Sequence, residues 1–268
     1  MKNTAFVPVL LSLLLLFSCG PSQREMAVRQ ISQSQMMLEQ GDTLGAIGLL
    51  DSVRQMYPKA EVQHSVSRKL IADLYQQMID KRQLQLIRKD SLIIELESDF
   101  IKEKTEFDKY TQYRHKRQSL SRSWDRSFLQ VHLDERGEIY LSSNYMGDEW
   151  LEHTGIRVYD GELQAKSEKI PIEDPLNHRS DFLDYKWEKV SYMNGKADSV
   201  IQFIATHPKL DLKCVFLGKR YYYILLEDFD IAAVSEALQL SEAIKTRKQL
   251  HDEINSYTQQ RKKYRADN

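Results

Sequence analysis

The chain has 268 residues, of which 41% are hydrophobic and 29% charged, and its 38 Lys and Arg residues nearly balance its 39 Asp and Glu residues. Two cysteines, ten glycines and six prolines are too few for a disulfide-stapled, collagen-like or low-complexity chain. The net charge of -1 lacks the positive excess typical of nucleic-acid-binding proteins, so we expect no nucleic-acid partner.

The first twenty residues have the pattern of an export signal. Lys2 is followed by an apolar stretch from Ala5 to Phe17, which is shorter than the roughly 20 residues needed to span a bilayer. The stretch runs into Leu16-Phe17-Ser18-Cys19-Gly20, which resembles the lipobox of bacterial lipoproteins. The alternative is an ordinary secretory signal in which Cys19 has no role.

The lipobox resemblance implies a signal peptide over residues 1–18, cleavage before Cys19, and lipid chains on Cys19 at the start of a short linker, residues 19–24. Each buried CH2 group contributes about 0.8 kcal/mol, and stable attachment takes at least two lipid signals. Gly20 stands where an inner-membrane retention signal has Asp, and no acidic run follows it. By the rules of that family, we expect a lipid-anchored envelope protein in the outer membrane, facing the periplasm.

Lipidation of Cys19 would leave Cys214 as an unpaired thiol. Cys214 lies in the apolar run from Leu212 to Leu217. We therefore expect it to be a buried core residue rather than a reactive one.

Residues 25–60 are predicted to form a helical hairpin with its turn at Gly41-Asp42 and its end at Tyr57-Pro58. This segment resembles one tetratricopeptide-type unit, on the spacing of Gly41, Ala46, Leu50 and Pro58. Such units normally stack in threes, and no second copy is visible. The favoured interpretation is a single hairpin packed on the next helix, and the alternative is a peptide-binding repeat array.

Residues 61–124 are predicted to form one long coiled-coil helix. Residues 61–122 contain neither Gly nor Pro, and apolar residues recur every seven positions, with charges on the other faces. The heptad residues are Ile79, Leu86, Ile93, Phe100 and Phe107.

Residues 125–228 change to the pattern of an antiparallel β module with about seven strands. Asp160-Gly161 and Asn194-Gly195 are hairpin-turn signals, and residues 171–184 are predicted to form a long loop. The predicted strands are Phe128–Leu133, Glu138–Leu141, Gly155–Tyr159, Trp187–Tyr192, Val200–Ala205, Leu210–Leu217 and Tyr221–Leu226.

Residues 229–268 return to a helical pattern, with Asp228 or Asp230 as its N-cap. Neither long helix can bury its apolar stripe alone. We therefore predict an α+β fold: an N-terminal helical hairpin, then a long antiparallel coiled-coil hairpin with the β module inserted at its tip. The alternative is two separate oligomeric coiled coils.

The sequence holds few patterns that indicate catalysis. No two of the seven histidines have metal-ligand spacing, and no nucleotide-binding or nucleophile-elbow motif is present. His178-Arg179-Ser180-Asp181 holds the residue types of a catalytic triad, but sequence neighbours cannot form one. We predict a non-enzymatic protein without metal or cofactor.

Aromatic residues are the strongest binding signal, because they combine flat apolar area with a polar tip. Within Tyr221-Tyr222-Tyr223, strand alternation directs Tyr222 to the face opposite its two neighbours. The alternative is that the aromatic residues mainly fill the core. The candidate contacts are Trp150, Tyr145, Tyr185 and Trp187.

The chain as a whole loosely resembles lipoproteins of Bacteroidota that combine a lipobox, a helical segment and a β module, a likeness that implies no activity. We predict an anchored protein that presents its β module on a coiled-coil stalk for protein-partner binding or scaffolding, without catalysis. The alternative is a glycan- or peptide-binding, or hydrolytic, β domain with a cleft formed by Trp150, Trp187 and residues 171–184.

Overall fold

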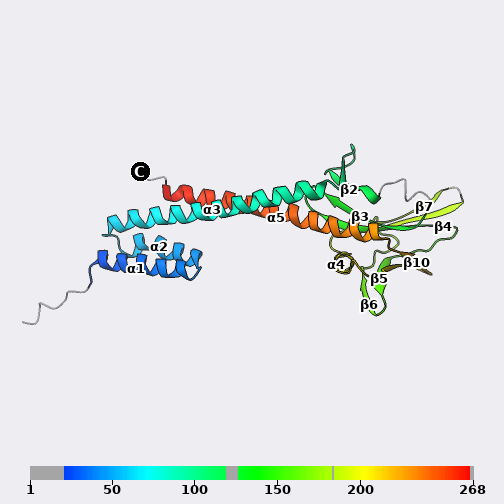
Figure 1. Ribbon diagram of the computed structural model, residues 1–268, viewed down its shortest axis with the longest axis horizontal. Coiled ribbons are helices and arrows are strands. Elements are labelled where there is room, and N and C mark those ends of the chain that lie inside the picture. Colours follow the sequence, from blue (N-terminus) through cyan, green and yellow to red (C-terminus); the bar gives the residue numbers. More distant parts are fainter. Residues whose placement is uncertain (1–20, 119–125, 183, 266–268) are drawn as a thin grey trace, which may run out of the picture. The chain divides into compact units, whose positions relative to one another are not determined.

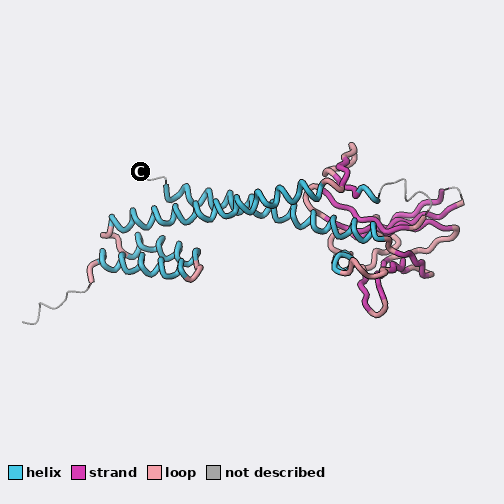
Figure 2. Tube along the Cα trace, in the orientation of Figure 1, coloured by secondary structure: helices cyan, strands magenta, loops and turns pink. Residues whose placement is uncertain are grey.

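The computed structural model describes residues 21–118, 126–182 and 184–265. Cys19 and the predicted signal peptide lie outside the described residues. The chain divides into two compact units, which we call the helical unit (residues 1–84 and 252–268) and the β unit (residues 85–251). All strands of the described ranges belong to the β unit (Figure 2).

The helical unit begins with two antiparallel helices, α1 (Gln23–Glu39) and α2 (Thr43–Met56) (Figure 1). The turn between them depends on Gly41, whose φ of 85° favours glycine, and on Asp42, whose carboxylate accepts a hydrogen bond from the N–H of Gly45 at 2.8 Å. The predicted hairpin and its turn are therefore confirmed.

Helix α2 packs on the third helix, α3 (Glu61–Glu97), as expected from the unburied faces of a single hairpin. The contact is an apolar cluster to which α2 contributes Ile47 and Leu50 and α3 contributes Ile71, Leu74 and Tyr75.

Helices α3 and α5 (Asp228–Arg265) form the predicted antiparallel pair. In the helical unit, the ring of Tyr75 lies 6.2 Å from that of Tyr257 and 6.1 Å from that of Tyr264. In the β unit, Asp90 faces Arg247 at 3.9 Å. The pairing is intramolecular. Because α5 starts at Asp228, both Asp228 and Asp230 lie within its first turn and neither is the N-cap. The carboxylate of Asp230 accepts the N–H of Glu227 at 3.3 Å.

The prediction of one helix over residues 61–124 is wrong beyond Glu97. The chain instead forms strands β1 (Phe100–Glu103) and β2 (Gln112–His115) and a short 3-10 helix, η1 (Lys116–Gln118). The heptad residue Phe100 packs edge-on against Tyr113 at 6.3 Å, whereas Phe107 is 89% exposed. The heptad spacing of these two aromatic residues therefore predicted a coiled-coil seam that the fold does not form there.

The β unit contains two antiparallel sheets. The six-stranded sheet has the order β1-β2-β3-β4-β8-β7, and the four-stranded sheet has the order β10-β9-β5-β6. The remaining bounds are β3 (Phe128–Asp134), β4 (Ile139–Gly147), β5 (Gly155–Asp160), β6 (Leu163–Lys166), β7 (Asn177–Phe182), β8 (Tyr185–Tyr192), β9 (Lys213–Leu217) and β10 (Tyr221–Leu225). Strand-rich structure therefore begins at Phe100 rather than at residue 125, and β7 occupies much of the predicted loop 171–184.

The predicted strand Val200–Ala205 is also wrong, because this segment lies in helix α4 (Asp198–Thr206). Val200, Ile201 and Ile204 are at most 1% exposed and share one helical face, which joins the core of the β unit. A short apolar run does not distinguish a strand from a buried helix by its periodicity.

The core of the β unit contains residues of both sheets, α4 and α5, together with Ile93 of α3. Cys214 lies fully buried in it, as predicted, and burial, followed by the charge of Asp230, raises the pKa of its thiol. Among the described helices, none is both long and apolar enough to cross a membrane.

Candidate functional site

Tyr145, a predicted exposed contact, is a core residue. It is 5% exposed, and its hydroxyl donates a hydrogen bond to the carbonyl of Glu149 at 3.0 Å. Its ring meets Tyr222 edge-on at 5.1 Å. The expectation of exposure is wrong because the β4 position of Tyr145 points between the sheets rather than outward.

Trp150 and Trp187 do not share a cleft. The half-buried indole of Trp150 lies 5.8 Å from the guanidinium of Arg179 and 5.5 Å from the ammonium of Lys186. Strand register places Arg179 opposite Glu188, so these two cations share the inward face of the β7–β8 hairpin with Glu188. Trp187 has the opposite parity and faces outward. The alternative prediction of a cleft formed by Trp150, Trp187 and residues 171–184 is therefore wrong, because the two tryptophans lie on opposite faces of the β7–β8 hairpin.

Tyr185 and Trp187 do stand together on the surface. They are two residues apart and therefore share the outward face of β8, where they are 46% and 43% exposed. Lys189 follows on the same face, opposite Asn144 and His178, and burial lowers the pKa of its ammonium. This part of β8 offers an aromatic pair beside a cation.

A second exposed group lies on β10. Tyr221, Tyr223 and Leu225 are 62%, 55% and 66% exposed, while Tyr222 packs against the core. The predicted alternation of the tyrosine run is confirmed. Sequence reasoning did not select Tyr221 and Tyr223 as contacts, although their alternation beside an apolar β9 was the available signal.

The fold also assembles a triad-like chain of polar groups that no sequence motif indicates. The Oγ of Ser143 lies 2.8 Å from Nε2 of His153, and Nδ1 of His153 lies 2.7 Å from Oε2 of Glu188. This is the connectivity of a serine, a histidine and a carboxylate in hydrolases. The Ser143 hydroxyl also lies 3.0 Å from that of Tyr192.

Burial gives this triad-like arrangement of Ser143, His153 and Glu188 a structural role. Ser143, His153 and Glu188 are each 0% exposed, so no substrate reaches the serine in this conformation. The Glu188 carboxylate accepts backbone N–H groups from Leu151 and Glu152 at 2.7 Å and from His153 at 3.0 Å.

The electrostatics of Glu188 agree with this role. Burial alone would raise the pKa of Glu188, but the hydrogen bonds from His153 and the backbone outweigh burial and lower it. The charged carboxylate therefore holds the residues before β5 against β8. No group of three His, Cys, Asp or Glu side chains in the described ranges is arranged to hold a metal ion.

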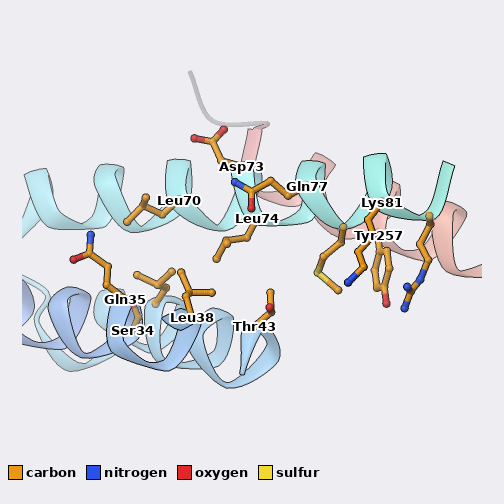
Figure 3. Close-up of a pocket in the computed structure, with 13 residues that line it drawn as sticks. Ser34, Gln35, Leu38, Thr43, Leu70, Asp73, Leu74, Gln77, Lys81 and Tyr257 are labelled. Atoms are coloured by element: carbon orange, nitrogen blue, oxygen red, sulfur yellow. The ribbon is translucent and has the colours of Figure 1, made fainter. Parts of the chain in front are cut away.

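The helical unit has a groove of about 590 Å³. Leu70 and Leu74 project from α3 toward Leu38 of α1, and Tyr257 of α5 lies toward one end (Figure 3). Asp73, Lys81 and Arg82 supply charges of both signs at its rim. The groove lies between the α1–α2 hairpin and α3, within the helical unit.

Comparison with protein-family models, with curated proteins and with solved structures finds no match to this chain. Function therefore has to be inferred from the groups just described.

Proposed function

We propose that this chain is a lipid-anchored protein of the bacterial cell envelope, tethered through Cys19, whose β unit binds a protein partner without catalysing a reaction. In sequence, helices α1, α2 and α3 lie between the tether and the first strand, and α5 follows the last strand. The proposed place is the outer membrane, with the protein facing the periplasm.

The observation that carries the binding proposal is the exposure of large side chains in two strand groups. Tyr185 and Trp187 on β8, and Tyr221, Tyr223 and Leu225 on β10, are 43–66% exposed. Isolated exposed apolar residues are ordinary, but rows of them along strands are typical of interaction surfaces.

A hydrolytic function has weaker support. Ser143 has the hydrogen-bond partners of a nucleophile, but its hydroxyl is enclosed between the sheets and also bonded to Tyr192. A nucleophile must approach its substrate within about 3–3.5 Å, and here the core fills that space.

The anchoring half of the proposal is tested in cells by Cys19→Ala. Loss of the acylated thiol should move the protein from the membrane fraction to the soluble fraction. A variant that stays in the membrane fraction contradicts the tether. The exposed Ser32→Ala serves as the control and should stay membrane-bound.

The binding half is tested by photo-crosslinking in whole cells from residues 187 and 223, with the exposed residue 162 as the control position. We expect one crosslinked protein from at least one of the first two positions and none from residue 162. Retention of a glycan without any crosslinked protein would favour the carbohydrate-binding alternative.

A further inference from the structure

Strand β10 is an open edge of the four-stranded sheet, because β9 is its only sheet neighbour within the described residues (Figure 1). The N–H of Gly218 donates to the carbonyl of Arg220, and the N–H of Leu226 donates to that of Leu212. In an antiparallel pair, hydrogen-bonded and non-hydrogen-bonded positions alternate. The backbone groups of residues 222 and 224 therefore face β9, and those of Tyr221, Tyr223 and Leu225 face the open edge.

This edge lacks the usual protection against pairing. Natural edge strands carry charges, prolines or bulges that prevent another strand from adding. The five residues of β10 are Tyr-Tyr-Tyr-Ile-Leu, with no charge and no proline. The backbone groups that face the open edge and the exposed side chains both belong to Tyr221, Tyr223 and Leu225. An added strand would therefore pair with the backbone of these residues and lie beside their side chains.

The outward face of this sheet is positively charged. Register places Val215 beside Tyr223, then Arg157 and Lys166 in the same row, and Lys213 beside Leu225. No strand position on this face carries a carboxylate. The Nε of Arg157 is buried and has no hydrogen-bond partner among the described residues.

The cations of the β9–β10 turn are already neutralised. Lys219 pairs with Glu152 at 2.6 Å, and Arg220 pairs with Glu149 at 2.6 Å. The excess charge therefore comes from the sheet face itself, next to β10.

We propose that β10 accepts an extended, acidic segment of a partner protein as a fifth strand of this sheet. Main-chain hydrogen bonds to residues 221, 223 and 225 supply the pairing, as in other strand-addition complexes, and the cations select an acidic segment. A second copy of this chain would bring like charges together and is disfavoured. This inference rests on the proposed function, because it names the surface and the chemistry of the protein partner.

The test uses two ten-residue acetylated peptides, one alternating Glu with Val and one alternating Lys with Val. They are added to the chain carrying Cys19→Ser, which removes the predicted acylation site. With the Glu peptide, amide hydrogen exchange at residues 221, 223 and 225 should slow at least tenfold, while residues 222 and 224, already bonded to β9, change little. The Lys peptide should bind at least tenfold more weakly.

Two variants sharpen the test. Tyr223→Pro removes an N–H that faces the open edge, which an edge strand tolerates, and should abolish peptide binding with the circular dichroism spectrum unchanged. Lys213→Glu changes an exposed side chain and should weaken binding of the Glu peptide at least tenfold. Ile101→Ala, at an exposed apolar residue of β1 in the other sheet, is the matched control and should bind as the parent does.

Equal binding of both peptides, or binding that survives Tyr223→Pro in a folded protein, overturns strand addition at β10. Protection of residues 221, 223 and 225 that rises with protein concentration alone, together with dimers in sedimentation, would assign the edge to a second copy instead. If strand addition fails while residue 187 still crosslinks a protein in cells, the proposed function stands and only the β10 assignment falls.

Discussion

His153 and Glu188 form a fully buried hydrogen-bonded pair, with Nδ1 of the imidazole 2.7 Å from Oε2 of the carboxylate. Glu188 lies on β8, and His153 precedes β5 of the other sheet. The pair thus links the two sheets of the β unit, and the three backbone N–H groups that Glu188 accepts extend that link to residues 151–153.

Replacing Glu188 by Gln should destabilise the β unit by about 3 kcal/mol, because three backbone N–H groups lose a charged acceptor and an amide N–H2 group faces donors. Urea denaturation followed by tryptophan fluorescence measures the change. The exposed Glu149→Gln, which removes only a surface ion pair, is the control and should shift stability by less than about 0.5 kcal/mol. A Glu188→Gln protein as stable as this control would show that the link is unimportant.

Acid should destabilise the fold through His132 below pH 6.5. Burial, then the charges of Lys189 and Arg114, lowers the pKa of this imidazole to about 3. Between pH 6.5 and 3 the unfolded chain binds a proton that the folded chain does not, so the free energy of unfolding falls as pH falls. Each such proton contributes up to about 1.4 kcal/mol per pH unit.

The variant His132→Gln should reduce the pH dependence of unfolding between pH 6 and 4, measured by urea denaturation at each pH. The exposed His178→Gln is the control and should leave the dependence unchanged. Identical pH profiles for His132→Gln and the parent would contradict the assignment.

Tyr75 should be the main side chain joining α3 to α5 in the helical unit. It is 9% exposed and contacts the rings of Tyr257 and Tyr264. Tyr75→Ala should cost about 3 kcal/mol by leaving a cavity, seen as faster amide exchange along the first half of α3. Leu84→Ala changes a residue of α3 that is 62% exposed and should have little effect. Equal exchange rates in the two variants would rule out this role for Tyr75.

Gly137 should resist substitution more than Gly161, although both have a positive φ, of 82° and 55°. A Cβ at residue 137 would lie 2.8 Å from the backbone oxygen of Ser241 on α5, whereas nothing lies within 4 Å of a Cβ at residue 161. Gly161→Ala should cost about 1 kcal/mol from backbone strain alone. Gly137→Ala should cost clearly more in the same thermal unfolding measurement, and equal costs would contradict the close approach of α5.

The sequence alone determined the features that depend on neighbours along the chain. The turn at Gly41-Asp42, the apolar stripes of α3 and α5, the alternation of Tyr221-Tyr222-Tyr223 and the burial of Cys214 follow from local periodicity and turn chemistry. Two stripes that cannot be buried alone also predicted that α3 and α5 pair, and the lipobox resemblance at Cys19 stays a prediction.

Only the tertiary structure decided which of two compatible local patterns was used. Phe100 fits a heptad, but it is buried in a β hairpin against Tyr113. Val200–Ala205 fits a strand, but its apolar residues complete the core as a helical face. Tyr145 and Trp187 are both aromatic strand residues, and register sends one to the core and the other to the surface. Ser143, His153 and Glu188 come together only when two sheets stack, because contacts between distant segments depend on packing and not on spacing along the chain.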